Sequence, residues 1–190
     1  MIAAARARSD ELRIDAVSTG AGAALRFLSG VVGARNVVEV GTGTGVSGLW
    51  LLRGMHPDGV LTSVDIEGEH LRLAREAFLE DGIAPNRTRL ITGRALDVLP
   101  RLADGAYDMV LIDGPADEFA LCLDEAMRLL RPNGLVVFAG AFGGGLVADP
   151  SQRDPETIAR RAMAHQVRDD ERLLPVLLPF GDGLLAAALR

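Results

Sequence analysis

The sequence predicts an α/β fold in which a mostly parallel, seven-stranded sheet ends in an antiparallel hairpin and carries helices on both faces. From Asn36 onward, short β-rich runs alternate with helical segments, which is typical of a parallel sheet with crossover helices. Near the end of the chain, the apolar runs Leu173–Phe180 and Leu184–Leu189 are joined only by a Gly-Asp-Gly turn. A parallel crossover needs a much longer connection, so these two strands should pair antiparallel.

The first 35 residues precede the sheet, and we expect one or two helices there, with a break near Ser18–Gly22. The apolar helix expected over Ala21–Val32 could pack against the core, or it could equally supply the face of a homodimer.

The central elements follow in a regular order. The five strands expected before the hairpin are Val37–Val40, Val60–Val64, Thr88–Ile91, Met109–Ile112 and Leu135–Ala139. The helices expected between them and before the hairpin are Val46–Arg53, Glu69–Glu80, Ala95–Leu102, Phe119–Leu130 and Pro155–Arg168. The Gly- and Pro-rich stretch Gly140–Asp154 would form a loop beyond the fifth strand and could act as a lid over a ligand site. We expect the 190 residues to form one domain.

Composition excludes several classes of function. All 20 basic residues are arginine, so no lysine can form a Schiff base, act as a general base or bind phosphate in a P-loop. The net charge of -6 disfavours a nucleic-acid partner, and no apolar run approaches the ~20 residues of a membrane span. Cys122 is the only cysteine, and the segment Met1–Asp15 is too charged for a secretory signal, which together indicate a cytoplasmic protein.

A glycine-rich loop is the most informative segment. The strand Val37–Val40 runs into Gly41-Thr42-Gly43-Thr44-Gly45 and then into a helix. Glycines at such a turn let backbone N–H groups approach a ligand closely. Asp65 ends the second strand, twenty residues past Gly45, where a carboxylate can accept hydrogen bonds from both hydroxyls of a ribose.

Two residues favour S-adenosylmethionine (SAM) over a dinucleotide. The dinucleotide fingerprint needs a small residue where this chain has Val46. Glu39 places a negative charge beside the loop, which disfavours phosphate and suits a cationic ligand. SAM carries a sulfonium and an ammonium group and no phosphate.

The segment Val37–Ser47 and the segment Thr62–Ile66 resemble the corresponding motifs of class I SAM-dependent methyltransferases. More narrowly, the chain resembles the bacterial O-methyltransferases related to catechol O-methyltransferase, also through Tyr107–Asp113 and Val147–Pro150. The resemblance runs from about Val17 to the C-terminus, and it implies a Rossmann-like class I methyltransferase fold.

The resemblance also implies site residues and a product, S-adenosylhomocysteine. Asp113, at the end of the fourth strand, matches a family residue that faces both the substrate and the metal, and we expect it to be the catalytic residue. The expected cofactor-binding residues are Val17, Glu39, Gly41, Thr42, Gly43, Ser47, Asp65, Ile66, Ala95 and Asp113.

The chain departs from this family where the metal-dependent members hold a divalent cation. Of the three oxygen ligands, only Asp113 is present, because the other two positions hold Ala139 and Gly140. The family's catalytic lysine falls on Ala116, and an aromatic residue of the lid falls on Gly143. A lone carboxylate is far from the roughly six oxygens that Mg²⁺ prefers, so we expect no metal site.

These observations predict a SAM-dependent O-methyltransferase that acts on a hydroxyl of a small molecule without a metal. Asp113 is the expected general base, ahead of Asp117, and His56, His70 and His165 are interpreted as structural. The leading alternative is a catalytically degenerate SAM-binding protein with a sensing or assembly role. A nucleic-acid methyltransferase and a dehydrogenase are weaker alternatives.

Overall fold

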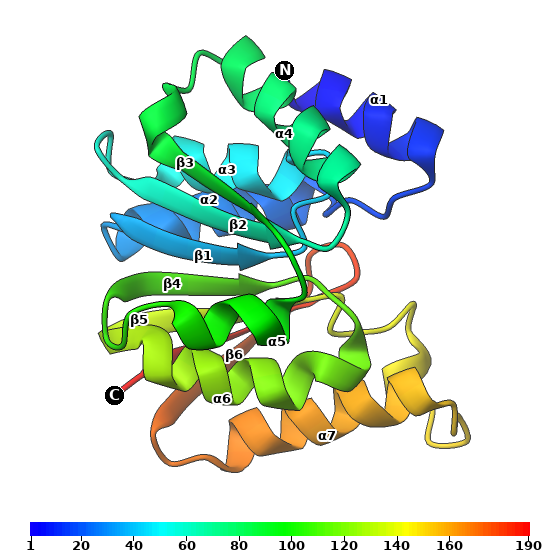
Figure 1. The fold of residues 1–190 in the computed structure, drawn as a ribbon. Helices are drawn as coiled ribbons and strands as arrows, with labels where there is room; N and C mark the ends of the chain where they lie inside the picture. The colour runs from blue at the N-terminus through cyan, green and yellow to red at the C-terminus, as the bar shows by residue number, and fades with distance from the viewer.

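The computed structural model describes residues 1–190 and contains one seven-stranded sheet between two layers of helices (Figure 1). The strand order is β3-β2-β1-β4-β5-β7-β6. The strands are β1 (Asn36–Val40), β2 (Val60–Asp65), β3 (Thr88–Thr92), β4 (Tyr107–Ile112), β5 (Leu130–Ala139), β6 (Leu173–Leu178) and β7 (Leu184–Leu189).

The terminal hairpin completes the sheet as expected. β7 pairs antiparallel with both β5 and β6, whereas the pairs formed by β1, β2, β3, β4 and β5 among themselves are parallel. The predicted fold class, including the mixed sheet and helices on both faces, is confirmed.

The α-helices form two layers, one on each face of the sheet (Figure 1). One face is covered by α1 (Ile2–Leu12), α2 (Thr19–Val31), α3 (Val46–Gly54) and α4 (Gly68–Glu80), which pack against Val37, Leu61 and Met109 of the sheet. The other face is covered by α5 (Ala95–Val98), α6 (Phe119–Leu129) and α7 (Pro155–Asp169). No helix is both long enough and apolar enough to span a bilayer.

Several predicted boundaries were wrong, among them the start of β5, which begins at Leu130 and not at the predicted Leu135. The break between the first helices falls before Ser18, because the Ser18 hydroxyl accepts a hydrogen bond from Ala21 N at 3.1 Å and caps α2 at its start. The helix expected over Ala95–Leu102 stops at Val98 and continues as a 3-10 turn, Leu99–Arg101. Pro100 has no N–H to donate to the preceding helical turn, which explains the change.

The segment Gly140–Asp154 is tied to α7 by Arg161. The Arg161 guanidinium donates hydrogen bonds to the carbonyl oxygens of Val147, Gln152 and Leu146 at 2.8, 2.8 and 3.0 Å. The short 3-10 turn Leu146–Ala148 lies within this segment. Its role as a lid stays a prediction.

Candidate active site

The carboxyl ends of β1, β2 and β4 meet at one edge of the sheet, where open α/β sheets bind ligands. Backbone hydrogen bonds of 2.9 Å join Gly41 N to Val64 O and Asp113 N to Val40 O, so the residues that follow these strands are held in register. Gly41 has a φ of 88°, and a Cβ added there would lie 2.0 Å from the carbonyl oxygen of Asp113. Only glycine allows the two chain segments to approach this closely.

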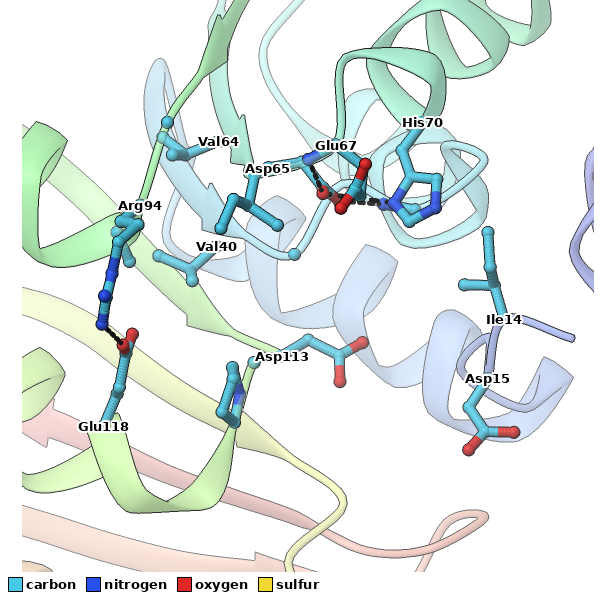
Figure 2. Close-up of a pocket in the computed structure, with 17 residues that line it drawn as sticks. Ile14, Asp15, Val40, Val64, Asp65, Glu67, His70, Arg94, Asp113 and Glu118 are labelled. Atoms are coloured by element: carbon cyan, nitrogen blue, oxygen red, sulfur yellow. Dashed lines mark hydrogen bonds and ion pairs between the residues drawn. The ribbon is translucent and has the colours of Figure 1, made fainter. Parts of the chain in front are cut away.

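The Asp65 carboxylate joins the glycine loop to the start of α4. It accepts hydrogen bonds from Gly43 N and Glu67 N, both at 2.9 Å, and its Oδ1 lies 3.1 Å from Nδ1 of His70 (Figure 2). The interpretation of His70 as a helix-start residue was incomplete, because its ring also lines the cavity beside Asp65.

Glu39 lies fully buried beneath the loop. Its Oε2 accepts a hydrogen bond from the Ser63 hydroxyl at 2.5 Å, and Ser63 Oγ lies 2.6 Å from Thr42 Oγ1. Its Oε1 has no hydrogen-bond partner. Burial raises the pKa of Glu39 to about 7, and the hydroxyls of Ser47 and Ser63 oppose that shift. An unpartnered carboxylate oxygen at this depth is a ready counter-charge for a cation.

The N-terminal segment closes the loop from the other side. Ser9 Oγ lies 2.5 Å from Thr44 Oγ1, which is also 2.8 Å from the carbonyl oxygen of Ala5. These contacts bring α1 against the loop, so that Ile14 and Asp15 border the site.

Three adjoining hollows make up the site. The first, with a volume of about 370 Å³, extends from Gly41 past Asp65 and Ile66 to Ala95, and the Arg94–Glu118 ion pair of 2.7 Å lies at its side (Figure 2). A volume of this order suits a small cofactor. The second, with a volume of about 650 Å³, lies between the loop that joins α1 to α2, the end of β5 and the turn before β7. The third is a narrow cleft over Thr42 and Ser47.

Asp113 lines all three hollows, as does Asp15. In Figure 2 both carboxylates extend into the space between the strand ends and the N-terminal segment. Burial raises the pKa of Asp113 to about 6, Arg160 opposes this shift and Asp15 adds to it. A carboxylate with such a pKa is ionised at neutral pH and retains some basicity, which suits a general base.

The structure brings the predicted site residues together. Every one of the ten lines one of the three hollows except Glu39, which is buried below them. Ala116, at the position of the family's lysine, is 2 % exposed and packs in the core, and Asp117 lines none of the three hollows.

Sequence reasoning missed three charged residues of the second hollow, Asp15, Arg160 and Asp182. Asp182 lies in the turn that the sequence did mark, between two glycines. Arg160 had no local signal, because an arginine within an amphipathic helix is normally a solvated residue.

Comparison with known proteins identifies the family. Residues 4–189 match the family described as O-methyltransferase. A Mycolicibacterium vanbaalenii protein named as an O-methyltransferase is 54% identical over 189 residues, which cover 99% of this chain and 83% of that protein. The chain belongs to the O-methyltransferase family.

Solved structures agree with this assignment. A Corynebacterium glutamicum protein has a TM-score of 0.93 with 31% identity, covering 99% of this chain and 88% of its own. The O-methyltransferase TomG of Streptomyces achromogenes, involved in tomaymycin synthesis and crystallised with SAM, has a TM-score of 0.89 with 28% identity, covering 99% of this chain and 88% of its own. This O-methyltransferase is therefore SAM-dependent, as the glycine loop and Asp65 indicated.

The donor set of this O-methyltransferase does not fit a divalent metal. The side chains of Ala139 and Gly140 supply no oxygen, and no three His, Cys, Asp or Glu side chains cluster closely enough to hold an ion. The carboxylates of Asp15, Asp113 and Asp182 line the second hollow without forming such a cluster.

Proposed function

We propose that this O-methyltransferase methylates a hydroxyl group of a small molecule bound in the second hollow, and that it does so without a divalent metal. The observation that carries the proposal is the position of Asp113, which lines both the hollow of about 370 Å³ and the hollow of about 650 Å³. A group at this junction can contact a cofactor on one side and an acceptor on the other.

The residues of the first hollow and the narrow cleft suit SAM. Asp65 offers carboxylate oxygens for the ribose hydroxyls, and Ile66, which is 62% exposed, offers an apolar surface for the adenine beside Ala95. The methionine end would lie along Gly41 and Gly43, between Val17, Thr42 and Ser47. The buried Glu39 supplies negative charge below it.

The chemistry needs positioning more than a metal. When bound, SAM supplies a methyl group on a positively charged sulfur, and the S–CH₃ bond breaks with its electron pair left on sulfur, giving S-adenosylhomocysteine. The acceptor oxygen forms the new C–O bond and gives its proton to Asp113, which passes it to water. Holding the oxygen in line with the methyl group lowers the barrier by up to ~7–11 kcal/mol in favourable systems.

Methyl transfer to a panel of catechols, phenols and hydroxylated metabolites tests the proposal, with S-adenosylhomocysteine formation as the readout. We expect transfer in excess EDTA to stay within about twofold of transfer in Mg²⁺, because the charged groups of the site belong to the chain itself. Transfer that requires Mg²⁺ would contradict the absence of a metal. SAM binding without transfer to any hydroxyl would favour the degenerate SAM-binding protein.

The pH dependence of SAM binding tests the role of Glu39. The pKa of Glu39 is about 7, and a cationic ligand binds its ionised form, so SAM should bind more tightly as the pH rises through 7. Glu39→Gln should weaken SAM binding by about 10- to 100-fold at pH 8, the value of a hydrogen bond to a charged group, and should flatten the pH dependence. Isothermal titration between pH 5.5 and 8.5 measures both effects.

Stability supplies a second measurement for Glu39. Between pH 4.5 and about 7, Glu39 is protonated in the folded protein but ionised in the unfolded chain. The contribution of Glu39 to the free energy of unfolding therefore falls as the pH rises from 4.5 to about 7. Glu39→Gln should remove this slope, whereas Glu171→Gln, an exposed control, should not. If SAM affinity keeps its pH dependence in Glu39→Gln, Glu39 is not the negative charge that binds SAM.

A further inference from the structure

We propose that the Arg160 guanidinium occupies the place of the missing divalent cation and binds the acceptor oxygen during transfer. The inference rests on the proposed function, and it assigns a charged group of the chain to the task that a metal performs in related enzymes. Arg160 lies on α7, and no residue of α7 lines the first hollow, in which the cofactor would bind.

Arg160 lies beside the positions of the missing metal ligands. Arg160 lines the second hollow together with Asp113, Ala139 and Gly140. Its Nη1 donates a hydrogen bond to the carbonyl oxygen of Gly140 at 3.0 Å. A Cβ added at Gly140 would lie 3.4 Å from the same nitrogen. The guanidinium therefore fills the space toward which the family's metal-binding side chain at this position would project.

The residues around the Arg160 side chain suit an arginine. The ring of Phe119 lies under the guanidinium, with 5.5 Å from Arg160 Cζ to the ring centroid, a distance typical of a cation–π contact. A Cβ added at Gly143 would lie 3.0 Å from Arg160 Cδ, so the glycine that replaces the family's aromatic residue gives the side chain its room. Gly140 and Gly143, which replace larger residues of the family, therefore both lie against the Arg160 side chain.

The positive charge of Arg160 is only weakly paired within the protein. The side chain is 16% exposed, and its one ion pair, 3.7 Å long, is with Glu156, which is 70% exposed. No ion pair within 4.0 Å links Arg160 to Asp113 or Asp182, although both carboxylates line the same hollow. The guanidinium has five N–H donors, and Gly140 O takes one of them. The other donors remain for an oxygen bound in the second hollow, which Arg160 and Asp113 both line.

This arrangement divides the chemistry between two side chains. Asp113 takes the proton of the acceptor hydroxyl, and Arg160 stabilises the negative charge that develops on the oxygen. Arginine keeps its charge at all working pH values, so the stabilisation needs no metal and does not titrate. This stabilisation should accelerate transfer most for hydroxyls that ionise with difficulty at neutral pH, such as those of catechol.

The test compares Arg160→Met and Arg160→Lys with the wild type, using catechol and 4-nitrocatechol as acceptors in EDTA. Arg168→Met is the matched control, because Arg168 lies on the same helix with its side chain 61% exposed. In Arg160→Met, kcat for catechol should fall about 10²–10³-fold, the usual loss on removing one charge-stabilising donor. The loss should be smaller for 4-nitrocatechol, which ionises more readily, and smaller at high pH. Arg160→Lys should recover part of the rate.

SAM affinity, measured by titration calorimetry, should stay within about threefold of wild type in all variants, because Arg160 lies outside the cofactor hollow. A kcat within twofold of wild type in Arg160→Met, or an equal loss for both acceptors at every pH, would overturn the role given to Arg160. The proposed function would stand. If the wild type methylates neither catechol nor 4-nitrocatechol, the proposed function is overturned for this class of acceptor, and this inference with it.

Discussion

Asp113→Asn should lower kcat for methyl transfer by about 10²–10⁴-fold, the range expected when a general base is removed. Asn is close to Asp in size, so the backbone hydrogen bond from Asp113 N to Val40 O should be kept. Wild-type kcat/KM should rise with pH through about 6, because the carboxylate accepts a proton only after it has ionised. Asp113→Asn should lose this rise, and a pH–rate profile from pH 5 to 8 measures both changes.

Asp117→Asn is the matched control for that experiment. Asp117 lies only four residues further along the chain, is exposed and lines none of the three hollows, so its replacement should leave kcat within about twofold. Thermal melts should place both variants near the wild type. If Asp113→Asn retains more than a tenth of the wild-type kcat and still shows the acid limb, another group takes the proton.

The fold and the cofactor site could be predicted because they depend on local patterns. Strand-forming runs followed by helical periods identify a parallel sheet, and the carboxyl ends of such strands share one edge. Gly41 directly follows β1 and Asp65 is the last residue of β2, so their positions come with the sheet. Even the hairpin of β6 and β7 was visible, since its connection is too short for any other pairing.

The acceptor side of the site depends on contacts between distant segments, and no local pattern shows them. Arg160 reaches Gly140 across twenty residues, and Asp15 enters the site only because α1 is held to the glycine loop through Ser9 and Thr44. The sequence alone showed that Ala139 and Gly140 replace two of the family's metal ligands. What replaces them could be found only when the helix α7 was placed in space.

The helix boundaries show the same limit at a smaller scale. Apolar periodicity extends from Ala95 to Leu102, but one missing N–H at Pro100 ends the α-helix early. Conversely, Gly22 lies within α2, where Trp50 packs so closely that an added Cβ at Gly22 would lie 2.2 Å from its Nε1. A glycine can signal close packing as well as a turn.

Gly41→Ala should lower the free energy of unfolding by about 3–5 kcal/mol and weaken SAM binding at least 100-fold. The added Cβ would lie 2.0 Å from the carbonyl oxygen of Asp113 and 2.9 Å from its carbonyl carbon, at a φ of 88° that alanine adopts only with strain. Backbone hydrogen bonds at Gly41 and Asp113 oppose any shift that would relieve the clash. A loss of this size should lower Tm by about 10 °C, measured by calorimetry.

Gly82→Ala separates the two causes of that loss. Gly82 has a φ of 78°, but nothing lies within 4 Å of an added Cβ, so its replacement adds backbone strain without a collision. It should cost about 1–2 kcal/mol and leave SAM affinity unchanged. The difference between the two variants is then the value of the close approach between the glycine loop and the strand that carries Asp113. Equal losses of stability in both, with SAM binding intact in Gly41→Ala, would mean that this approach is not needed to hold cofactor and general base together.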